Sequence, residues 1–220
     1  MHAMLHASGL RFAYPSGGFT LRVPEWHVRP GETVALSGPS GTGKTTLLKL
    51  FAGILPSRDG GRLTIAQQDL QALSAKALRD FRRRQLGLIF QDFALLDYLS
   101  VRDNVLLPLR LAGELTPSHE TRARALIESL DLRTHWQSLV GEMSQGERQR
   151  VAVARALVHE PGVVLADEPT SSVDARRRHL VMEMLTRHAR EKQASLIMVT
   201  HDTGLFSAVD RVVRMEEWTS

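Results

Sequence analysis

The 220-residue sequence contains no cysteine, which excludes disulfide bonds and thiolate metal sites. Long apolar stretches are also missing: because no run reaches the ~18 apolar residues that a membrane span needs, we expect no transmembrane helix. The first six residues carry no basic segment before an apolar one, so we expect no secretion signal. Together these absences favour a protein of the cytosol.

The composition is that of a soluble globular chain, with 43% hydrophobic and 24% charged residues. A chain of this length forms one large domain, or a domain with a subdomain. The formal net charge is +4, and arginine supplies most of the positive charge. A basic balance fits binding to nucleic acid or to an anionic lipid surface, but it more often reflects an ordinary solvated surface.

Residues 38–45 read Gly-Pro-Ser-Gly-Thr-Gly-Lys-Thr and fit the phosphate-loop pattern G-x-x-x-x-G-K-[ST]. The apolar residues 34–36 predict a buried strand before the loop, and leucines at helical spacing predict a helix after it. In this context backbone N–H groups face nucleotide phosphates, Lys44 reaches the β- and γ-phosphates, and Thr45 binds Mg²⁺. The alternative, a glycine-rich turn that happens to precede a lysine, leaves this context unexplained.

Two adjacent carboxylates, Asp167 and Glu168, follow the continuous apolar run of residues 163–166. Such a pair at the end of a buried strand is costly unless a ligand uses it. We expect Asp167 to hold Mg²⁺ opposite Thr45 and Glu168 to polarise a water molecule. The alternative is an acidic helix cap.

Two more predicted strands are each followed by a polar side chain. Gln91 follows residues 86–90, and His201 follows the apolar run of residues 195–199. Neither residue is unusual alone, but ligands of parallel α/β sheets bind at the carboxyl edge of the strands. The sequence therefore predicts one site along this edge.

Ser144 and Glu147 form a predicted capping box at the start of a helix. The same geometry also makes an anion site, because a serine hydroxyl and glycine N–H groups lie at a helix N-terminus. Tyr14, at the end of a predicted strand, either stacks on a nucleotide base or packs at the sheet edge.

In this order the motifs resemble those of the ATP-binding cassette (ABC) ATPase family, over nearly the whole chain. The resemblance rests on the phosphate loop, Gln91, a helical insertion, residues 144–150, Asp167 with Glu168, residues 171–174 and His201. It implies an α/β P-loop fold with a RecA-like parallel-sheet core, an antiparallel β subdomain and a helical subdomain. Residues 1–220 then form a single ABC ATPase domain, with residues 1–92 and 159–220 in the core and β subdomain, and residues 93–158 in the helical subdomain.

The resemblance also implies a role for each matching residue. Tyr14 stacks on adenine, and the phosphate contacts are Ser40, Gly41, Thr42, Gly43, Lys44, Thr45 and Thr46. Thr45, Gln91 and Asp167 surround Mg²⁺. Glu168 is the general base, and His201, Gln91 and Lys44 complete the catalytic group. Ser144 and Gly146 contact the γ-phosphate of ATP bound to the other subunit, which implies a homodimer with ATP at its interface.

Two motifs depart from the family pattern. Residues 143–147 read Met-Ser-Gln-Gly-Glu where Leu-Ser-Gly-Gly-Gln is usual, and residues 171–174 read Ser-Ser-Val-Asp where a leucine before the aspartate is commoner. Ser144, Gly146 and Asp174 are retained, so we expect ATP hydrolysis at both sites of the dimer.

Residues 86–91, 95–96 and 103–109 resemble the group of ABC ATPases that serve lipoprotein release, macrolide export and cell division. The resemblance implies a separately encoded integral membrane partner, and a position in the cytoplasm on the inner face of the plasma membrane. Phe93, Leu95 and Leu96 are candidates for the groove that takes the partner's coupling helix, the alternative being core packing. Importer ATPases share much of this pattern and remain an alternative.

A second class of function is an ABC-type ATPase that acts on nucleic acid or ribosomes, prompted by the arginine runs at residues 82–84 and 176–178. Against it, the chain has one cassette and no heptad insertion, so no specific nucleic acid is expected. A P-loop kinase would leave residues 144–147 unexplained.

Overall fold

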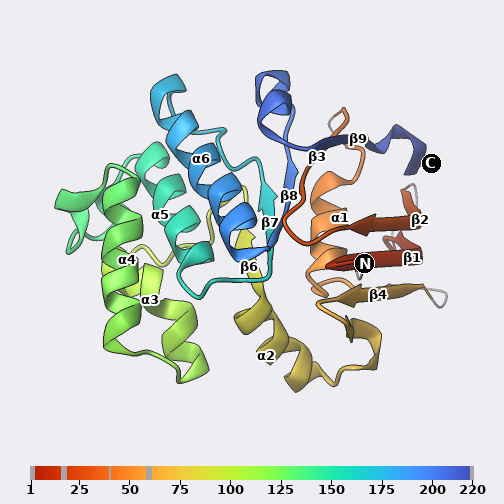
Figure 1. Cartoon of the computed structure of the whole chain (residues 1–220), viewed down its shortest axis with the longest axis horizontal. Helices are drawn as coiled ribbons and strands as arrows, with labels where there is room; N and C mark the ends of the chain where they lie inside the picture. The colour runs from red at the N-terminus through yellow and green to blue at the C-terminus, as the bar shows by residue number, and fades with distance from the viewer. Residues whose placement is uncertain (1–2, 16–18, 40, 58–60, 219–220) are drawn as a thin grey trace.

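The computed structural model describes residues 3–15, 19–39, 41–57 and 61–218. Two sheets and several helices make up the chain (Figure 1). The parallel sheet has the strand order β6-β7-β8-β3-β9, with β6 at Leu86–Ile89, β7 at Val163–Asp167, β8 at Ser195–Val199, β3 at Thr33–Ser37 and β9 at Arg211–Arg214. Every residue of β7 and β8 is buried, as expected for parallel strands covered on both faces.

A second, antiparallel sheet has the order β2-β1-β4-β5, with β2 at Thr20–Val28, β1 at Leu5–Ala13, β4 at Arg62–Ile65 and β5 at Gln68–Asp69. The alternation of apolar and polar residues over 19–23 predicts a strand that ends before Pro24, and this prediction is wrong because β2 continues to Val28. β2 is an edge strand, and its register with β1 joins Val23 to Leu10 and Glu25 to Ser8 while it skips Pro24, so a missing N–H is tolerated at this position.

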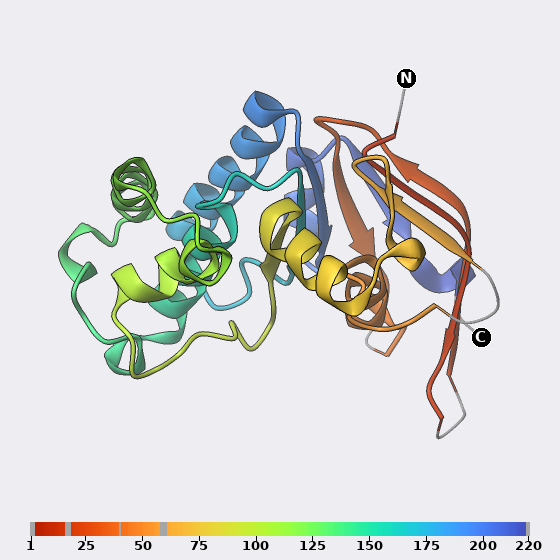
Figure 2. The ribbon, with the colours of Figure 1, turned by 90° about the horizontal axis from the view of Figure 1, so that it is seen from below.

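Helix α1 (Lys44–Phe51) follows β3 and lies between the two sheets (Figure 2). Its apolar residues pack in one core with both sheets, and the Phe51 ring stacks on Trp26 of β2 with ring centroids 5.3 Å apart. The phosphate loop is therefore fixed at both ends, by a central strand and by a helix held in the core.

The other helices are α2 (Ala75–Gln85), α3 (Val101–Ala112), α4 (Pro117–Ser129), α5 (Gln145–Leu157) and α6 (Ala175–Lys192). Short 3₁₀ helices span Leu70–Ala72, Arg133–His135, Val140–Glu142, Thr203–Ala208 and Met215–Trp218. Helices α3, α4 and α5 gather at the end of the molecule away from the antiparallel sheet (Figure 1). Ser74, Ser100 and Ser144 cap α2, α3 and α5 through side-chain oxygens.

The predicted α/β architecture is confirmed: it combines a parallel core, an antiparallel sheet and a separate group of helices. No helix within the described part of the chain is both long and apolar enough to cross a bilayer.

Candidate functional site

A cavity of about 640 Å³ opens at the carboxyl edge of the parallel sheet. Its lining residues are Tyr14, Phe19, Gly41, Gly43, Lys44, Thr45, Thr46, Gln91, Asp167, Glu168, Ser171, Val199 and His201. The fold thus brings together most of the site residues that the sequence singles out. Phe19 and Val199 also line the cavity, although the sequence does not indicate a site role for either. Ser171, which belongs to the 171–174 motif but has no predicted contact, lines it too. Ser40 lies outside the described residues.

The phosphate loop takes a backbone shape that requires glycine at Gly43. Gly43 has φ +75°, and a Cβ there would overlap the ring of Phe19. The Lys44 ammonium donates hydrogen bonds to the carbonyl oxygens of Gly38, at 2.7 Å, and Pro39, at 2.8 Å. Thr42 closes the same loop, because its hydroxyl donates to the Pro39 carbonyl at 2.8 Å. The positive charge therefore lies within the loop, where phosphate oxygens would meet it.

Tyr14 forms an aromatic wall of the cavity together with Phe19, at a centroid distance of 6.1 Å. Its ring meets Phe12 edge to face at 4.8 Å, and its hydroxyl lies 3.0 Å from the Thr46 hydroxyl. Tyr14 nevertheless keeps 40% of its surface exposed, so it can present ring area to a planar base.

Thr45 and Asp167 lie directly opposite each other, and the Thr45 hydroxyl donates to Asp167 Oδ2 at 2.6 Å. Burial raises the pKa of the Asp167 carboxyl, and the hydrogen bond from Thr45 opposes that shift. No group of three or more histidine or acidic side chains in the described residues could hold a metal by itself. One hydroxyl and one carboxylate suit Mg²⁺, which takes few protein oxygens and completes its shell with phosphate and water.

Glu168 and His201 form the second polar pair of the site. His201 Nδ1 lies 2.7 Å from Glu168 Oε1, and the His201 backbone N–H donates to the same oxygen at 3.2 Å. The Glu168 side chain is 13% exposed, whereas that of His201 is 76% exposed. The loop after β8 therefore orients a carboxylate that follows β7. Gln91, exposed after β6, lines the same cavity.

Ser144 and Glu147 form the capping box that the sequence predicts. The Glu147 carboxylate accepts from the Ser144 hydroxyl at 2.6 Å and from its backbone N–H at 2.9 Å, and the hydroxyl hydrogen bond lowers the pKa of Glu147. Neither Ser144 nor Gly146 is among the described residues that line the cavity. Both residues therefore lie outside the cavity that holds Lys44 and Asp167.

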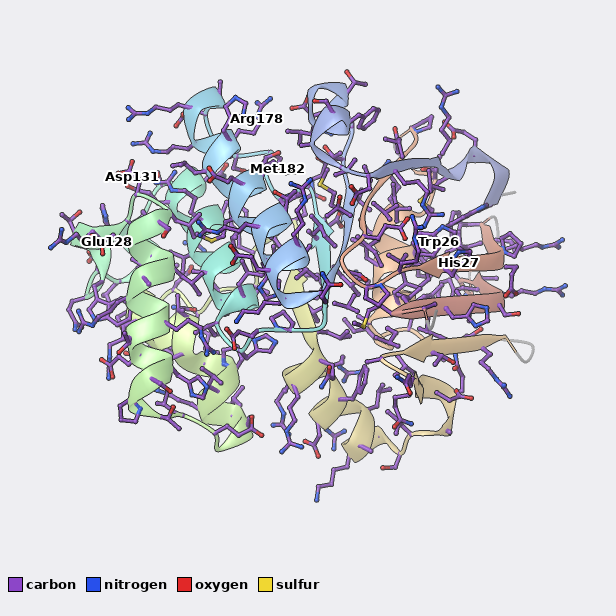
Figure 3. The ribbon with its side chains drawn as sticks, viewed as in Figure 1. Trp26, His27, Glu128, Asp131, Arg178 and Met182 are labelled. Atoms are coloured by element: carbon purple, nitrogen blue, oxygen red, sulfur yellow. The ribbon has the colours of Figure 1, made fainter. Side chains whose placement is uncertain are left out.

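Arginines in both runs have partners inside the chain. In the first run, Arg82 donates to the Gly53 carbonyl, Arg83 pairs with Asp80, and Arg84 pairs with Glu114. In the second run, Arg177 pairs with Asp131, which follows α4, and Arg178 pairs with Asp202; Figure 3 shows Arg178 on α6. These arginines serve the fold, which weakens the argument for nucleic-acid binding.

The chain matches the family model described as "ABC transporter" over residues 21–171. It is 42% identical to the lipoprotein-releasing system ATP-binding protein LolD 1 of Rhodopirellula baltica over 205 residues, covering 92% of this chain and 89% of that protein. It is 39% identical to LolD of Chromohalobacter salexigens over 217 residues, covering 97% and 91%. It is also 40% identical to the uncharacterised ABC transporter ATP-binding protein YvcR of Bacillus subtilis, covering 86% and 73%.

Solved structures give the same result. The dimeric ATP-binding cassette MJ0796, in a post-hydrolysis state bound to ADP and phosphate, superposes with a TM-score of 0.86 at 28% identity, covering 96% of this chain and 94% of that one. The structure of cbiO1 from Clostridium perfringens, part of the ABC transporter complex cbiONQ, superposes with a TM-score of 0.81 at 27% identity, covering 96% and 84%. The chain therefore belongs to the ABC transporter family, as an ATP-binding and ATP-hydrolysing subunit with the ABC-ATPase fold.

Proposed function

We propose that this ATPase drives a membrane complex of the lipoprotein-release type and that it works as a homodimer on the cytoplasmic face of the membrane. The observation that carries the proposal is the pairing of Thr45 with Asp167 and of Glu168 with His201 around one cavity at the phosphate loop. Several of the relatives are lipoprotein-releasing ATPases, which favours that class over an importer.

In the proposed reaction, Lys44 neutralises charge on the γ-phosphoryl group while Glu168 orients the attacking water and takes its proton. The hydrogen bond from His201 fixes the carboxylate, so the base is positioned before the nucleotide arrives. Cleavage of the γ-phosphoryl bond leaves ADP and phosphate. Mg²⁺, held by Thr45 and Asp167 with Gln91 nearby, would supply further charge neutralisation at the β- and γ-phosphates when bound.

In this proposal, the capping box at Ser144 contacts the ATP that is bound by the other subunit of the dimer. Because Ser144 and Gly146 lie outside their own chain's cavity, they serve the nucleotide bound by the other subunit. Each ATP is then enclosed by two chains, and ATP binding closes the dimer. Hydrolysis reopens it, and the helical region passes the motion to the membrane partner.

The partner's docking site is a second groove, of about 380 Å³, between α2, α3, α5 and β6. Its apolar lining includes Leu86, Leu88, Phe90, Leu107, Pro108 and Leu111, and its basic lining is Arg79, Arg82, Arg83 and Arg155. Phe93 is buried and Leu95 packs against the core, and none of the three sequence candidates Phe93, Leu95 and Leu96 lines the groove. We propose that the groove takes an amphipathic helix whose acidic side chains face the exposed Arg79 at its basic rim.

Leu111→Glu tests this groove. Leu111 is 60% exposed, so the substitution places a carboxylate in the groove at little cost to the fold. We expect the variant to keep its basal ATPase activity and to lose capture of the membrane partner. Leu139→Glu, at a 43% exposed leucine outside the groove, is the matched control.

The proposed function is tested with Glu168→Gln locked by ATP as bait for detergent-solubilised membranes and for soluble lysate of the source organism. Captured proteins are identified by mass spectrometry. We expect an integral membrane protein with few helices and a large external domain. A many-helix permease would instead make the chain an importer subunit, and ribosomes or DNA without a membrane protein would contradict the transport assignment.

A further inference from the structure

Gln149 of α5 joins the helix that begins at Ser144 to the segment that carries Glu168. Its side chain is 1% exposed, and both ends of its amide are used. Nε2 donates to the Glu168 carbonyl at 2.7 Å, and Oε1 accepts from the Ser172 backbone N–H at 2.8 Å. A carbonyl needs a donor and an N–H needs an acceptor, and the Gln149 amide in this orientation satisfies both.

The backbone segment that Gln149 contacts has an unusual conformation at Glu168, the proposed base. Glu168 has φ +49°, in the left-handed region that a residue with a side chain rarely adopts. The Glu168 N–H bonds to the Val199 carbonyl at 3.0 Å, and its own carbonyl also accepts from the Ser171 N–H at 3.2 Å. The surrounding hydrogen bonds therefore support this left-handed conformation, and Gln149 supplies one of them from a separate helix.

Helix α5 contacts the 171–174 segment at a second position, Gly146. A Cβ at Gly146 would come 2.8 Å from the Ser172 carbonyl oxygen, so α5 and the 171–174 segment meet without room for a side chain. The start of α5 and the backbone after Glu168 thus form one packed unit within the chain.

We propose that Gln149 is a positioning residue for Glu168. The amide holds the Glu168 backbone in its left-handed conformation, and so keeps the carboxylate in its hydrogen-bonded position beside His201. The inference rests on the proposed role of Glu168 as the base. Ser144 caps the N-terminus of α5, and Gln149 lies within the same helix. A movement of Ser144 when it contacts the ATP of the partner subunit would therefore be passed through α5 to Glu168 of its own chain.

Gln149→Met tests the proposal, since methionine keeps the length of the side chain and removes both hydrogen bonds. We expect kcat to fall about tenfold, the equivalent of the one buried hydrogen bond that reaches the Glu168 carbonyl, with KM for ATP changed less than about twofold. Thr186→Val is the control, because it removes a buried hydroxyl whose hydrogen bonds stay within α6. A wild-type kcat in Gln149→Met would overturn the proposal.

Gln149→Glu provides a second test, which measures the effect of the lost donor on kcat even if the methionine variant does not fold. The introduced carboxylate accepts from Ser172 but cannot donate to the Glu168 carbonyl, so we expect a similar loss in kcat. Its protonated form regains a donor, so the ratio of variant to wild-type kcat should rise as pH falls. A ratio independent of pH would contradict the role of the donor.

Adding Gln149→Met to Glu168→Gln separates positioning of the base from damage to the dimer. If Gln149 acts through Glu168, the double variant dimerises at the same ATP concentration as Glu168→Gln and keeps its residual rate. Loss of ATP-driven dimerisation in the double variant would overturn the inference. Normal hydrolysis by Glu168→Gln alone would instead refute the proposed base, so the two failures are distinguishable.

Discussion

Replacing Tyr14 with alanine separates recognition of the base from recognition of the phosphates. Tyr14 packs edge to face on Phe12 at 4.8 Å, yet it is 40% exposed, so part of its ring surface is open to a base. Stacking of a base on an aromatic ring contributes about 1–3 kcal/mol, which corresponds to an ATP affinity weaker by roughly 5- to 150-fold in Tyr14→Ala. Tyr14→Phe keeps the ring and loses only the contact with Thr46, so its affinity should stay within about threefold.

Calorimetric titration with ATP and with inorganic triphosphate is the assay. The triphosphate carries no base, so Tyr14→Ala should bind it as the wild type does while binding ATP more weakly. Thermal unfolding provides the folding control, because loss of the edge-to-face pair with Phe12 costs about 0.5–1.5 kcal/mol. An equal loss of affinity for both ligands, or none for ATP, would refute the stacking role.

Three further predictions concern metal binding, loop shape and pH. Thr45→Val removes the hydroxyl facing Asp167, so kcat should fall at least about tenfold and half-maximal activity should need more Mg²⁺ in a metal titration. Gly43→Ala should weaken ATP binding more than about tenfold in calorimetry because its Cβ meets Phe19, whereas Gly113→Ala, at φ +71° in open space, should only lower stability. Burial lowers the pKa of His159 from 6.5 to about 4, so between these pH values the folded state binds fewer protons than the unfolded state. The free energy of unfolding should therefore fall by up to about 3 kcal/mol as pH drops from 6.5 to 4. In urea unfolding, His159→Gln should flatten this dependence.

Much of the site could be predicted because its residues sit where strands end. Apolar runs identify β7 and β8, and polar side chains follow both at one edge of the sheet. The phosphate loop is contiguous in sequence, so Lys44 and Thr45 needed no tertiary information. The capping box at Ser144 is equally local.

What could not be predicted depends on contacts between distant segments. Phe19 reaches the phosphate loop only because β1 and β2 pair beside α1, and nothing in its own neighbourhood indicates this. Gln149 bonds to backbone groups at Glu168 and Ser172, and backbone partners leave no trace in the residue types. The residues around Pro24 predict that the strand ends there, whereas β2 continues to Val28, because the edge position that tolerates a proline is set by the sheet order and not by the strand's own sequence.

The role of Glu168 as the base and the shared ATP site are tested together by ATP turnover and molecular mass of Glu168→Gln with ATP and Mg²⁺, measured by phosphate release and light scattering. We expect a hydrolysis rate at least about 100-fold below wild type, together with a stable dimer that forms only with ATP. A wild-type hydrolysis rate in this variant would show that Glu168 is not the base. A chain that stays monomeric at saturating ATP would contradict the shared ATP site.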